Sequence, residues 1–402
     1  MDVVATAGHV DHGKSALVRA LTGMEPDRWA EERRRGMTID LGFAWTTLPG
    51  GRDIAFVDVP GHERFVTNML AGVGPAPAAL VVVAADEGWM PQTAEHVAVL
   101  DALGVRHALV VVTKSDLADP DPVALDAVER LGDTSMRGAE VVRVSARTGA
   151  GLDLLSAALA RLLAALPRPD LTQPVRLWVD RAFTIRGAGT VVTGTLAAGR
   201  LRVGDELELH PTGRRVAVRG LQTRKQPSEC VDAVARVAVN LRGVDRDAVA
   251  RGMALTTPAA WQPSSELDVV VDLPPAHQQL VVHVGAAAVP ARARRLDAHA
   301  ARLRLASPLP LHLGDRLLLR EPSTRQLWPA DVAELAPRPL RRRGDAQRAA
   351  ADLRLPASAP QLVDRHGIVT TAQLRAWGVE PTGGQGRRVG RWHVSERRWD
   401  EA

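Results

Sequence analysis

The sequence predicts an α/β P-loop domain followed by two antiparallel β-barrels and a partial winged-helix module. Three observations lead to this fold class. Residues 8–15 match the pattern G-x-x-x-x-G-K-[ST] between an expected strand and an expected helix. Uninterrupted apolar strands then alternate with amphipathic helices, which indicates a parallel sheet covered on both faces. From about residue 175 onward, short alternating strands recur at barrel spacing with glycine turns between them.

Composition limits the class of protein. The chain has 402 residues, enough for two to four domains, and a net charge of +5, which is compatible with RNA as a partner. Its single cysteine, Cys230, excludes an internal disulfide framework and a zinc site built on cysteines, and it fits a reducing compartment. We find no signal peptide before the first expected strand and no apolar run of about 18 residues. We therefore expect a cytoplasmic protein with no membrane segment.

The motif at residues 8–15 supplies a phosphate site. Residues 2–7 form the expected strand before it, and the helix begins at the end of the motif, which is the setting that the motif needs. Glycines let successive N–H groups face one anion, and the helix N-terminus adds its dipole. The lysine supplies a charge for the β and γ phosphates, and the serine hydroxyl can ligate Mg²⁺. The expected residues are Asp11, His12, Gly13, Lys14 and Ser15.

Three further motifs follow predicted strands. A strand over residues 53–58 ends in Asp58, which can hold Mg²⁺ through water, and the N–H of Gly61 can bind the γ-phosphate. A buried strand over residues 108–113 leads into Thr113, Lys114 and Asp116. The aspartate can accept from the N1–H and the exocyclic amine of guanine, a donor pair that adenine lacks. The segment ending in Ser145 and Ala146 places a backbone N–H near guanine O6. Four motifs in this order, each at a strand end, indicate a GTP site.

The first 168 residues resemble the translational GTPases. The resemblance lies in Gly-His-Val-Asp-His-Gly-Lys-Ser (8–15), Arg-Gly-Met-Thr-Ile (35–39), Asp-Val-Pro-Gly-His-Glu (58–63) and Thr-Lys-Ser-Asp (113–116). It implies that His62 positions the attacking water when the ribosome drives it into place. It also implies that Val10 and Met37 form an apolar gate, and that Thr38 is the second Mg²⁺ ligand. Thr113 stands where many GTPases have an asparagine, whose amide braces the guanine site.

The remaining chain divides after a proline-broken linker at residues 167–174. We predict a GTP-binding domain at 1–168, a first barrel at 169–260, a second barrel at 261–338 and a linker with one winged-helix-like module at 339–402. The last prediction depends on residues 361–379, which resemble a helix–turn–helix, and on residues 391–394, a candidate wing strand. The basic run at 340–344 is read as a solvated linker.

Residues 1 to about 335 resemble the selenocysteine-specific elongation factors more than elongation factor Tu. The stretches are residues 35–44, 180–195, 283–286 and 308–316. The resemblance implies a selenocysteinyl pocket made of Asp180, Arg181 and Arg236. Two arginines can stabilise a selenolate anion, whereas serine is neutral, and the aspartate orients one guanidinium. Members usually carry several winged-helix modules, and the last ones bind the messenger hairpin. Hairpin binding by this chain therefore stays open.

The implied function is GTP-dependent delivery of selenocysteinyl-tRNA to the ribosome at UGA, with hydrolysis of GTP to GDP and phosphate. GTP or GDP and Mg²⁺ are the expected cofactors, the tRNA and the ribosome are the expected partners, and we expect a monomer. One alternative is a general aminoacyl- or initiator-tRNA carrier on the same scaffold. Another is a nucleic-acid-binding regulator that uses residues 361–394 on duplex DNA. A GTPase without activity is disfavoured by the presence of Lys14, Ser15, Thr38, Asp58 and His62.

Overall fold

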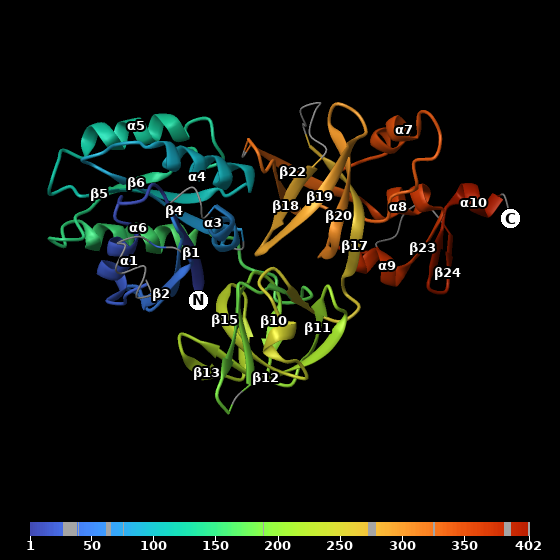
Figure 1. Cartoon of the computed structure of the whole chain (residues 1–402), viewed down its shortest axis with the longest axis horizontal. Coiled ribbons are helices and arrows are strands. Elements are labelled where there is room, and N and C mark those ends of the chain that lie inside the picture. The colour runs from blue at the N-terminus through green and yellow to red at the C-terminus, as the bar shows by residue number, and fades with distance from the viewer. Residues whose placement is uncertain are drawn as a thin grey trace. The chain divides into compact units, whose positions relative to one another are not determined.

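A computed structural model covers the 402 residues and describes all of them except 27–37, 39, 62–65, 75, 188, 272–278, 325, 382–386 and 401–402, together with the side chains of 66 and 67. The chain divides into two compact units (Figure 1). Unit 1 consists of residues 1–205 and 218–252, and unit 2 consists of residues 206–217 and 253–402. Of the described helices, none combines the length and the hydropathy that a membrane-spanning helix needs.

Unit 1 begins with a six-stranded sheet in the order β2-β3-β1-β4-β5-β6. The strands are β1 (Asp2–Ala7), β2 (Gly42–Thr47), β3 (Asp53–Asp58), β4 (Ala78–Ala84), β5 (His107–Thr113) and β6 (Glu140–Arg143). Only β2 runs antiparallel to its neighbour among these strands; the others pair in parallel. The parallel strands are continuous apolar runs because both of their faces are buried, which confirms the predicted α/β domain.

Helices cover both faces of this sheet (Figure 1). They are α1 (Lys14–Thr22), α3 (Val66–Val73), α4 (Pro91–Ala102), α5 (Asp121–Leu131) and α6 (Leu152–Ala164). On one face, Leu17 of α1 and Leu159 of α6 share a buried cluster with Phe56 and Leu80 of the sheet. The other face carries α3, α4 and α5. Because the parallel strands run in the same direction, their carboxyl ends lie at one edge of the sheet. The loops that follow these strands can meet there around a ligand.

Antiparallel strands make up the second segment. In unit 1 these are β7 (Arg176–Trp178), β8 (Arg181–Ile185), β9 (Gly189–Leu196), β10 (Arg200–Arg202), β13 (Gln226–Ser228), β14 (Cys230–Asp232) and β15 (Ala235–Arg242), with a short 3₁₀ turn at Arg246–Ala248. β9 pairs with β15 and β8, and β10 pairs with β14. In unit 2, β11 (Glu206–His210) pairs with β16 (Ala254–Thr256) and with the start of β12 (Arg214–Thr223). The strand expected from 175 is interrupted at Val179 and Asp180, which lie between β7 and β8.

A closed barrel forms the centre of unit 2, in the order β17-β20-β19-β18-β21-β22. The strands are β17 (Gln262–Val270), β18 (Gln279–Val284), β19 (Ala287–Arg295), β20 (Ala300–Leu311), β21 (Arg316–Arg320) and β22 (Leu327–Glu334). All six lie inside the predicted segment 261–338. Inward residues such as Leu267, Leu303 and Leu318 are fully buried, as alternation in a barrel requires. The limits of the four predicted domains stay a prediction.

The C-terminal module of unit 2 contains α7 (Asp345–Ala351), α8 (Ala359–His366), β23 (Ile368–Thr370), α9 (Thr371–Ala376), β24 (Arg387–Val389), β25 (Trp392–Val394) and α10 (Glu396–Asp400). Both α8 and α9 begin with a capping box. A three-stranded sheet in the order β23-β25-β24 contains the expected wing strand. Trp377, which follows α9, is buried and donates from its indole nitrogen to Gln262 of the barrel at 2.9 Å.

Candidate functional site

The phosphate loop curls around the Lys14 ammonium group. Helix α1 begins at this lysine, and Gly13 before it has a φ of 80°, a conformation that favours glycine. Lys14 Nζ donates to the carbonyl oxygens of Gly8 at 3.1 Å and His9 at 2.6 Å. A Cβ at Gly61 would lie 2.6 Å from the backbone nitrogen of Val10 and 2.5 Å from Lys14 Nζ, so only glycine allows this segment to approach the backbone of the loop. The lysine and the predicted γ-phosphate contact therefore lie together.

Three oxygen-bearing side chains meet beside the lysine. Ser15 Oγ donates to Asp58 Oδ2 at 2.6 Å and lies 3.0 Å from Thr38 Oγ1. Thr6 Oγ1 donates to the other carboxylate oxygen of Asp58 at 2.7 Å. Asp58 is fully buried, and burial raises the pKa of its carboxyl group although the bond from Ser15 and the Lys14 charge oppose that rise. Two hydroxyls and a buried carboxylate are ligands that Mg²⁺ prefers, so these residues fit the ion.

Helix α4 holds the phosphate loop from behind, a role that sequence reasoning missed. Gly8 N–H donates to His96 Nδ1 at 3.0 Å, His9 N–H to Thr93 Oγ1 at 3.2 Å, and Val10 N–H to Gln92 Oε1 at 3.3 Å. Because desolvation is the main effect, burial lowers the pKa of His96 to about 3, which keeps its ring neutral and able to accept. The sequence did hold a signal for this role. It consists of three polar residues, Gln92, Thr93 and His96, in the first two turns of a helix that starts at a proline.

The side chains of His12 and Asp11, two predicted residues of the phosphate site, lie in different surroundings. The His12 ring is fully buried, with Nδ1 3.3 Å from the carbonyl oxygen of Val82, and burial lowers the pKa of the ring to about 4. Asp11 is exposed and has a φ of 64°. What these two residues can offer a phosphate is their backbone N–H groups. Of the predicted gate, Val10 is described, whereas Met37 lies outside the described residues.

The predicted base site is assembled at the ends of β5 and β6. Asp116 accepts from Ser145 Oγ at 2.5 Å and from Arg147 Nε at 2.8 Å. These bonds, that from Ser145 first, lower the pKa of the Asp116 carboxyl group, so it stays an acceptor at neutral pH. Ala146 directly follows Ser145 at the same edge. Sequence reasoning assigned no role to Arg147, which occupies one acceptor oxygen of the aspartate.

Thr113 and Lys114 join the base site to its surroundings. Thr113 is buried, and its hydroxyl donates to the carbonyl oxygen of His12 at 2.7 Å, so a threonine also braces the phosphate loop. Lys114 Nζ donates to Asp86 at 3.1 Å and to Glu87 at 2.7 Å. His62, the predicted catalytic residue, lies outside the described residues.

The structure brings Asp180, Arg181 and Arg236 together in unit 1. Arg236 binds both carboxylate oxygens of Asp180, with Nη2 2.7 Å from Oδ1, and Thr193 donates to the same oxygen at 2.7 Å. Asp180 is 5% exposed. Its carboxylate fixes one guanidinium by the bidentate geometry that arginine favours.

Residues that the sequence did not single out complete this arginine pair. The centroid of the Phe43 ring lies 3.8 Å from Arg236 Cζ and 4.7 Å from Arg181 Cζ. Both guanidinium groups therefore pack against the same aromatic ring. Arg181 also donates to the Leu41 carbonyl and lies 3.4 Å from an oxygen of Asp40. A cavity of about 340 Å³ is lined by the two arginines and also by Phe43, Trp45 and Lys225.

Comparison with known proteins gives consistent results. Residues 1–165 match the family model "Elongation factor Tu GTP binding domain", and residues 189–256 match "Elongation factor Tu domain 2". A selenocysteine-specific elongation factor from Desulfomicrobium baculatum is 41% identical over 342 residues, which cover 81% of this chain and 54% of that protein. The chain spans about half the length of the curated relatives it matches.

Solved structures agree with the sequence relatives. The crystal structure of a bacterial selenocysteine-specific elongation factor, EF-Sec, has a TM-score of 0.91 and 31% identity, and the match covers 98% of this chain and 70% of that chain. The elongation factor SelB from Methanococcus maripaludis, in complex with the GTP analogue GppNHp, has a TM-score of 0.73 and 27% identity, and the match covers 84% of this chain and 80% of that one.

Proposed function

This chain belongs to the family of selenocysteine-specific elongation factors, and from that membership we propose that it binds GTP and delivers selenocysteinyl-tRNA to the ribosome. The proposed reaction is hydrolysis of GTP to GDP and phosphate. We infer that it acts in the cytoplasm as a monomer.

The nucleotide half of the proposal is supported by the phosphate loop and the base site. Lys14 is held among the loop carbonyls, from which its ammonium group can turn to the β and γ phosphates. Asp116 presents acceptors to the two guanine donors. Ser15, Thr38 and Asp58 would hold Mg²⁺, the last through water, and the ion would neutralise charge on the phosphates. His62 would orient the attacking water.

The proposal that the cargo is selenocysteinyl-tRNA is supported by the placement of Arg181 and Arg236 around Asp180 and Phe43. A selenol has a lower pKa than a thiol, so the selenocysteinyl group is an anion at neutral pH. Two guanidinium groups in a partly buried site favour that anion over the neutral hydroxyl of serine. Asp180 is already bound to Arg236, which limits attraction for other anions.

The testing experiment compares binding of selenocysteinyl-tRNA and seryl-tRNA to the full chain, with GTP and with GDP. We expect a large preference for the selenocysteinyl form with GTP only. Arg181→Ala and Arg236→Ala should reduce that preference and leave GTP binding unchanged. Arg200→Ala is the matched control, because Arg200 is a partly exposed arginine of the same antiparallel segment whose partner is Asp232.

The outcomes separate the proposal from its alternatives. Equal binding of the two tRNAs would contradict the selenocysteine cargo and favour a general aminoacyl- or initiator-tRNA carrier. Binding of duplex DNA without binding of either tRNA would favour a regulator that acts through residues 361–394.

A further inference from the structure

Thr113, the last residue of β5, connects the phosphate loop to the base site. Its hydroxyl donates to the carbonyl oxygen of His12 at 2.7 Å and lies 3.4 Å from that of Val83. The side chain is 2% exposed, and a Cβ at Gly13 would lie 3.8 Å from its oxygen. Asp116 follows in the same segment. One side chain thus contacts the loop and adjoins the group that is proposed to select guanine.

The connectivity of a nucleotide decides which part of guanine faces this residue. The base is joined to ribose through its five-membered ring, and the phosphates follow the ribose. When the phosphates occupy the loop and the N1–H edge occupies Asp116, the five-membered ring lies on the side of the loop. Thr113 occupies that side, because its hydroxyl contacts the loop at His12. The ring nitrogen N7, which only accepts hydrogen bonds, is the polar atom that guanine presents there.

The side chains of this segment hold their donors toward the protein. A hydroxyl group carries one donor hydrogen, and that of Thr113 is directed to backbone carbonyl oxygens. The lone pairs that remain on Oγ1 can only accept, as N7 does. The next residue, Lys114, donates from its ammonium group to Asp86 at 3.1 Å and to Glu87 at 2.7 Å. The geometry therefore places an acceptor, and not a donor, on the N7 side of the base.

We propose that Thr113 determines how the base is read by leaving N7 of guanine without a hydrogen-bond donor. Guanine is then selected through its N1–H, its exocyclic amine and O6 alone. The inference rests on the proposed function, because it requires the base to lie at Asp116. It goes further by stating which atom of the base does not contribute to binding. A guanine nucleotide with C–H in place of N7 is therefore an equal ligand for this chain.

The first test uses the unmodified full chain and two nucleotides, GTP and 7-deaza-GTP, which differ only in the replacement of N7 by C–H. Competition against a fluorescent guanine nucleotide in the presence of Mg²⁺ gives both dissociation constants. Since no hydrogen bond is lost, we expect the two Kd values to agree within about twofold, less than one net hydrogen bond usually contributes. Weaker binding of 7-deaza-GTP by more than this factor would overturn the proposal.

Substitutions at position 113 separate recognition of N7 from support of the loop. An asparagine has two amide protons, one for the His12 carbonyl and one for N7. Thr113→Asn should therefore prefer GTP over 7-deaza-GTP by about 2- to 12-fold, the range of one net hydrogen bond. Thr113→Ala removes the bond to His12 and should weaken both nucleotides by the same factor. Thr113→Ser keeps the hydroxyl and should match the unmodified chain.

Two results with these variants would contradict the proposal. Equal binding of the two nucleotides by Thr113→Asn would mean that position 113 does not face N7. A Kd ratio that differs between Thr113→Ala and the unmodified chain would mean that the threonine hydroxyl itself senses N7. The comparison of nucleotides on the unmodified chain decides the question even if a variant does not fold.

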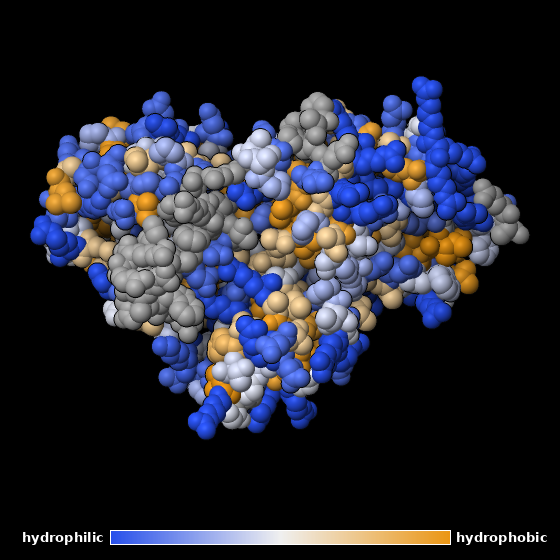
Figure 2. All heavy atoms as spheres, viewed as in Figure 1, coloured by the Kyte–Doolittle hydropathy of each residue, from blue (hydrophilic) through white to orange (hydrophobic). Residues whose placement is uncertain are grey.

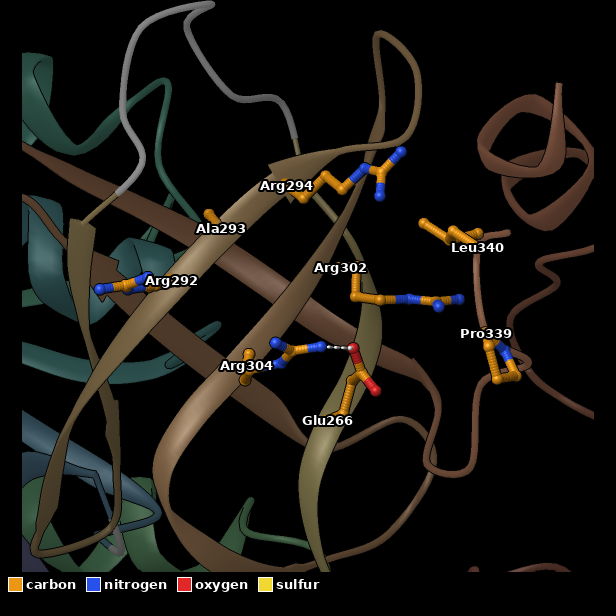
Figure 3. A pocket seen from close by; sticks show the side chains of 8 residues that line it. All are labelled: Glu266, Arg292, Ala293, Arg294, Arg302, Arg304, Pro339 and Leu340. Carbon is orange, nitrogen blue, oxygen red and sulfur yellow. Dashed lines mark hydrogen bonds and ion pairs between the residues drawn. The ribbon is translucent and has the colours of Figure 1, made fainter. Parts of the chain in front are cut away.

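The control concerns charge elsewhere on the chain. Figure 2 shows strongly hydrophilic side chains over α7 and the neighbouring end of the barrel of unit 2. On that barrel a pocket is lined by charged side chains from three strands, namely Glu266, Arg292, Arg294, Arg302 and Arg304 (Figure 3). Positive charge attracts any triphosphate, whatever its base. Arg292→Ala with Arg294→Ala should therefore leave the ratio of the two dissociation constants unchanged.

ATP as a third nucleotide distinguishes failure of this inference from failure of the proposed function. If the chain bound ATP as tightly as GTP, the proposed guanine site would be wrong, and this inference with it. If the chain preferred GTP to ATP but bound 7-deaza-GTP more weakly than GTP, only the role of Thr113 would be wrong. Preference for GTP over ATP, together with equal binding of GTP and 7-deaza-GTP, is the expected result and supports both.

Discussion

At the scale of single residues, Asp116 shows how a recognition group is kept ready for its ligand. Its two carboxylate oxygens are already occupied by Ser145 and Arg147. The serine is buried, whereas the Arg147 side chain is 74% exposed. The serine bond therefore fixes the carboxylate, and the arginine bond is the one that guanine can replace.

A pair of substitutions tests this division. Asp116→Asn should weaken GTP binding by at least about tenfold, because a hydrogen bond to a charged group contributes about 1.5–3 kcal/mol. Arg147→Ala should strengthen GTP binding by no more than about fivefold, because an exposed ion pair contributes about 0–1 kcal/mol. Equilibrium titration with a fluorescent guanine nucleotide measures both. If Arg147→Ala weakened binding as much as Asp116→Asn, the arginine itself would be a nucleotide ligand.

At the scale of elements, the segment that leads into β2 touches both functional sites. Thr38 lies 3.0 Å from Ser15 at the expected metal site. The carboxylate of Asp40 lies between two arginines, with Oδ1 3.0 Å from Arg251 Nη1 and Oδ2 3.4 Å from Arg181 Nη2. Phe43, on β2, contacts the guanidinium groups of the proposed cargo pocket. A change at the γ-phosphate that moves Thr38 would thus move the partners of Arg181.

This connection makes a prediction about Asp40. Asp40→Ala should release Arg181 in both nucleotide states, so the ratio of selenocysteinyl-tRNA affinity with GTP to that with GDP should fall. GTP affinity itself should not change. Filter binding with each nucleotide measures the ratio. Asp53→Ala is the matched control, since Asp53 binds another barrel arginine, Arg224, at 2.7 Å. An equal fall of this affinity ratio in both variants would mean that removal of either carboxylate has the same effect. That result would contradict a specific role for Asp40.

At the scale of the whole molecule, buried polar and aromatic groups fix the C-terminal module to its barrel within unit 2. Glu334 is 2% exposed and accepts from Arg365 at 2.8 Å and from His366 at 3.1 Å. Burial alone would raise the pKa of Glu334, but these two partners lower it to about 2. Trp377 packs beside His366, with ring centroids 4.9 Å apart. The module and the barrel should therefore unfold together.

Removal of Trp377 tests that joint behaviour. Trp377→Ala should lower the free energy of unfolding by about 3–5 kcal/mol, the usual cost of deleting a buried large aromatic side chain. Trp377→Phe, which keeps much of the volume and loses the bond to Gln262, should cost less. Urea unfolding followed by limited proteolysis reports the unfolding of the C-terminal module and of the barrel separately. Selective loss of the C-terminal module, with the barrel intact, would contradict joint unfolding.

Acid should destabilise the barrel of unit 2 through His283. Burial lowers the pKa of this histidine from 6.5 to about 4, so the unfolded chain binds the proton more readily than the folded one. The contribution of a neutral His283 to the free energy of unfolding is therefore present above pH 6.5. It is lost as the pH falls toward 4, and the loss reaches about 2 kcal/mol at pH 5. His283→Gln should flatten the dependence of urea midpoint on pH between 7 and 5. The exposed His299 supplies the control, His299→Gln, which should leave the dependence unchanged.

Much of the molecule was determined by the sequence itself. The parallel strands could be predicted because burial on both faces leaves apolar runs without alternation, as at residues 108–113. Residues 8–15 were identifiable because a phosphate loop needs its glycines and lysine at fixed spacing. The second barrel and the wing strand also agreed with alternation and turn residues. The edge strand β2 was not predicted because, unlike the parallel strands, it is only partly buried and so leaves no uninterrupted apolar run.

Only the tertiary structure decided which distant residues cooperate. No local pattern shows that Gln92, Thr93 and His96 hold the phosphate loop more than 80 residues earlier, because those bonds depend on how α4 packs against β1 and β4. The stacking of Phe43 under two barrel arginines and the pairing of Arg147 with Asp116 are also long-range contacts. Motif spacing records what one segment must do locally, whereas contacts between segments are set by packing, which a single sequence does not display.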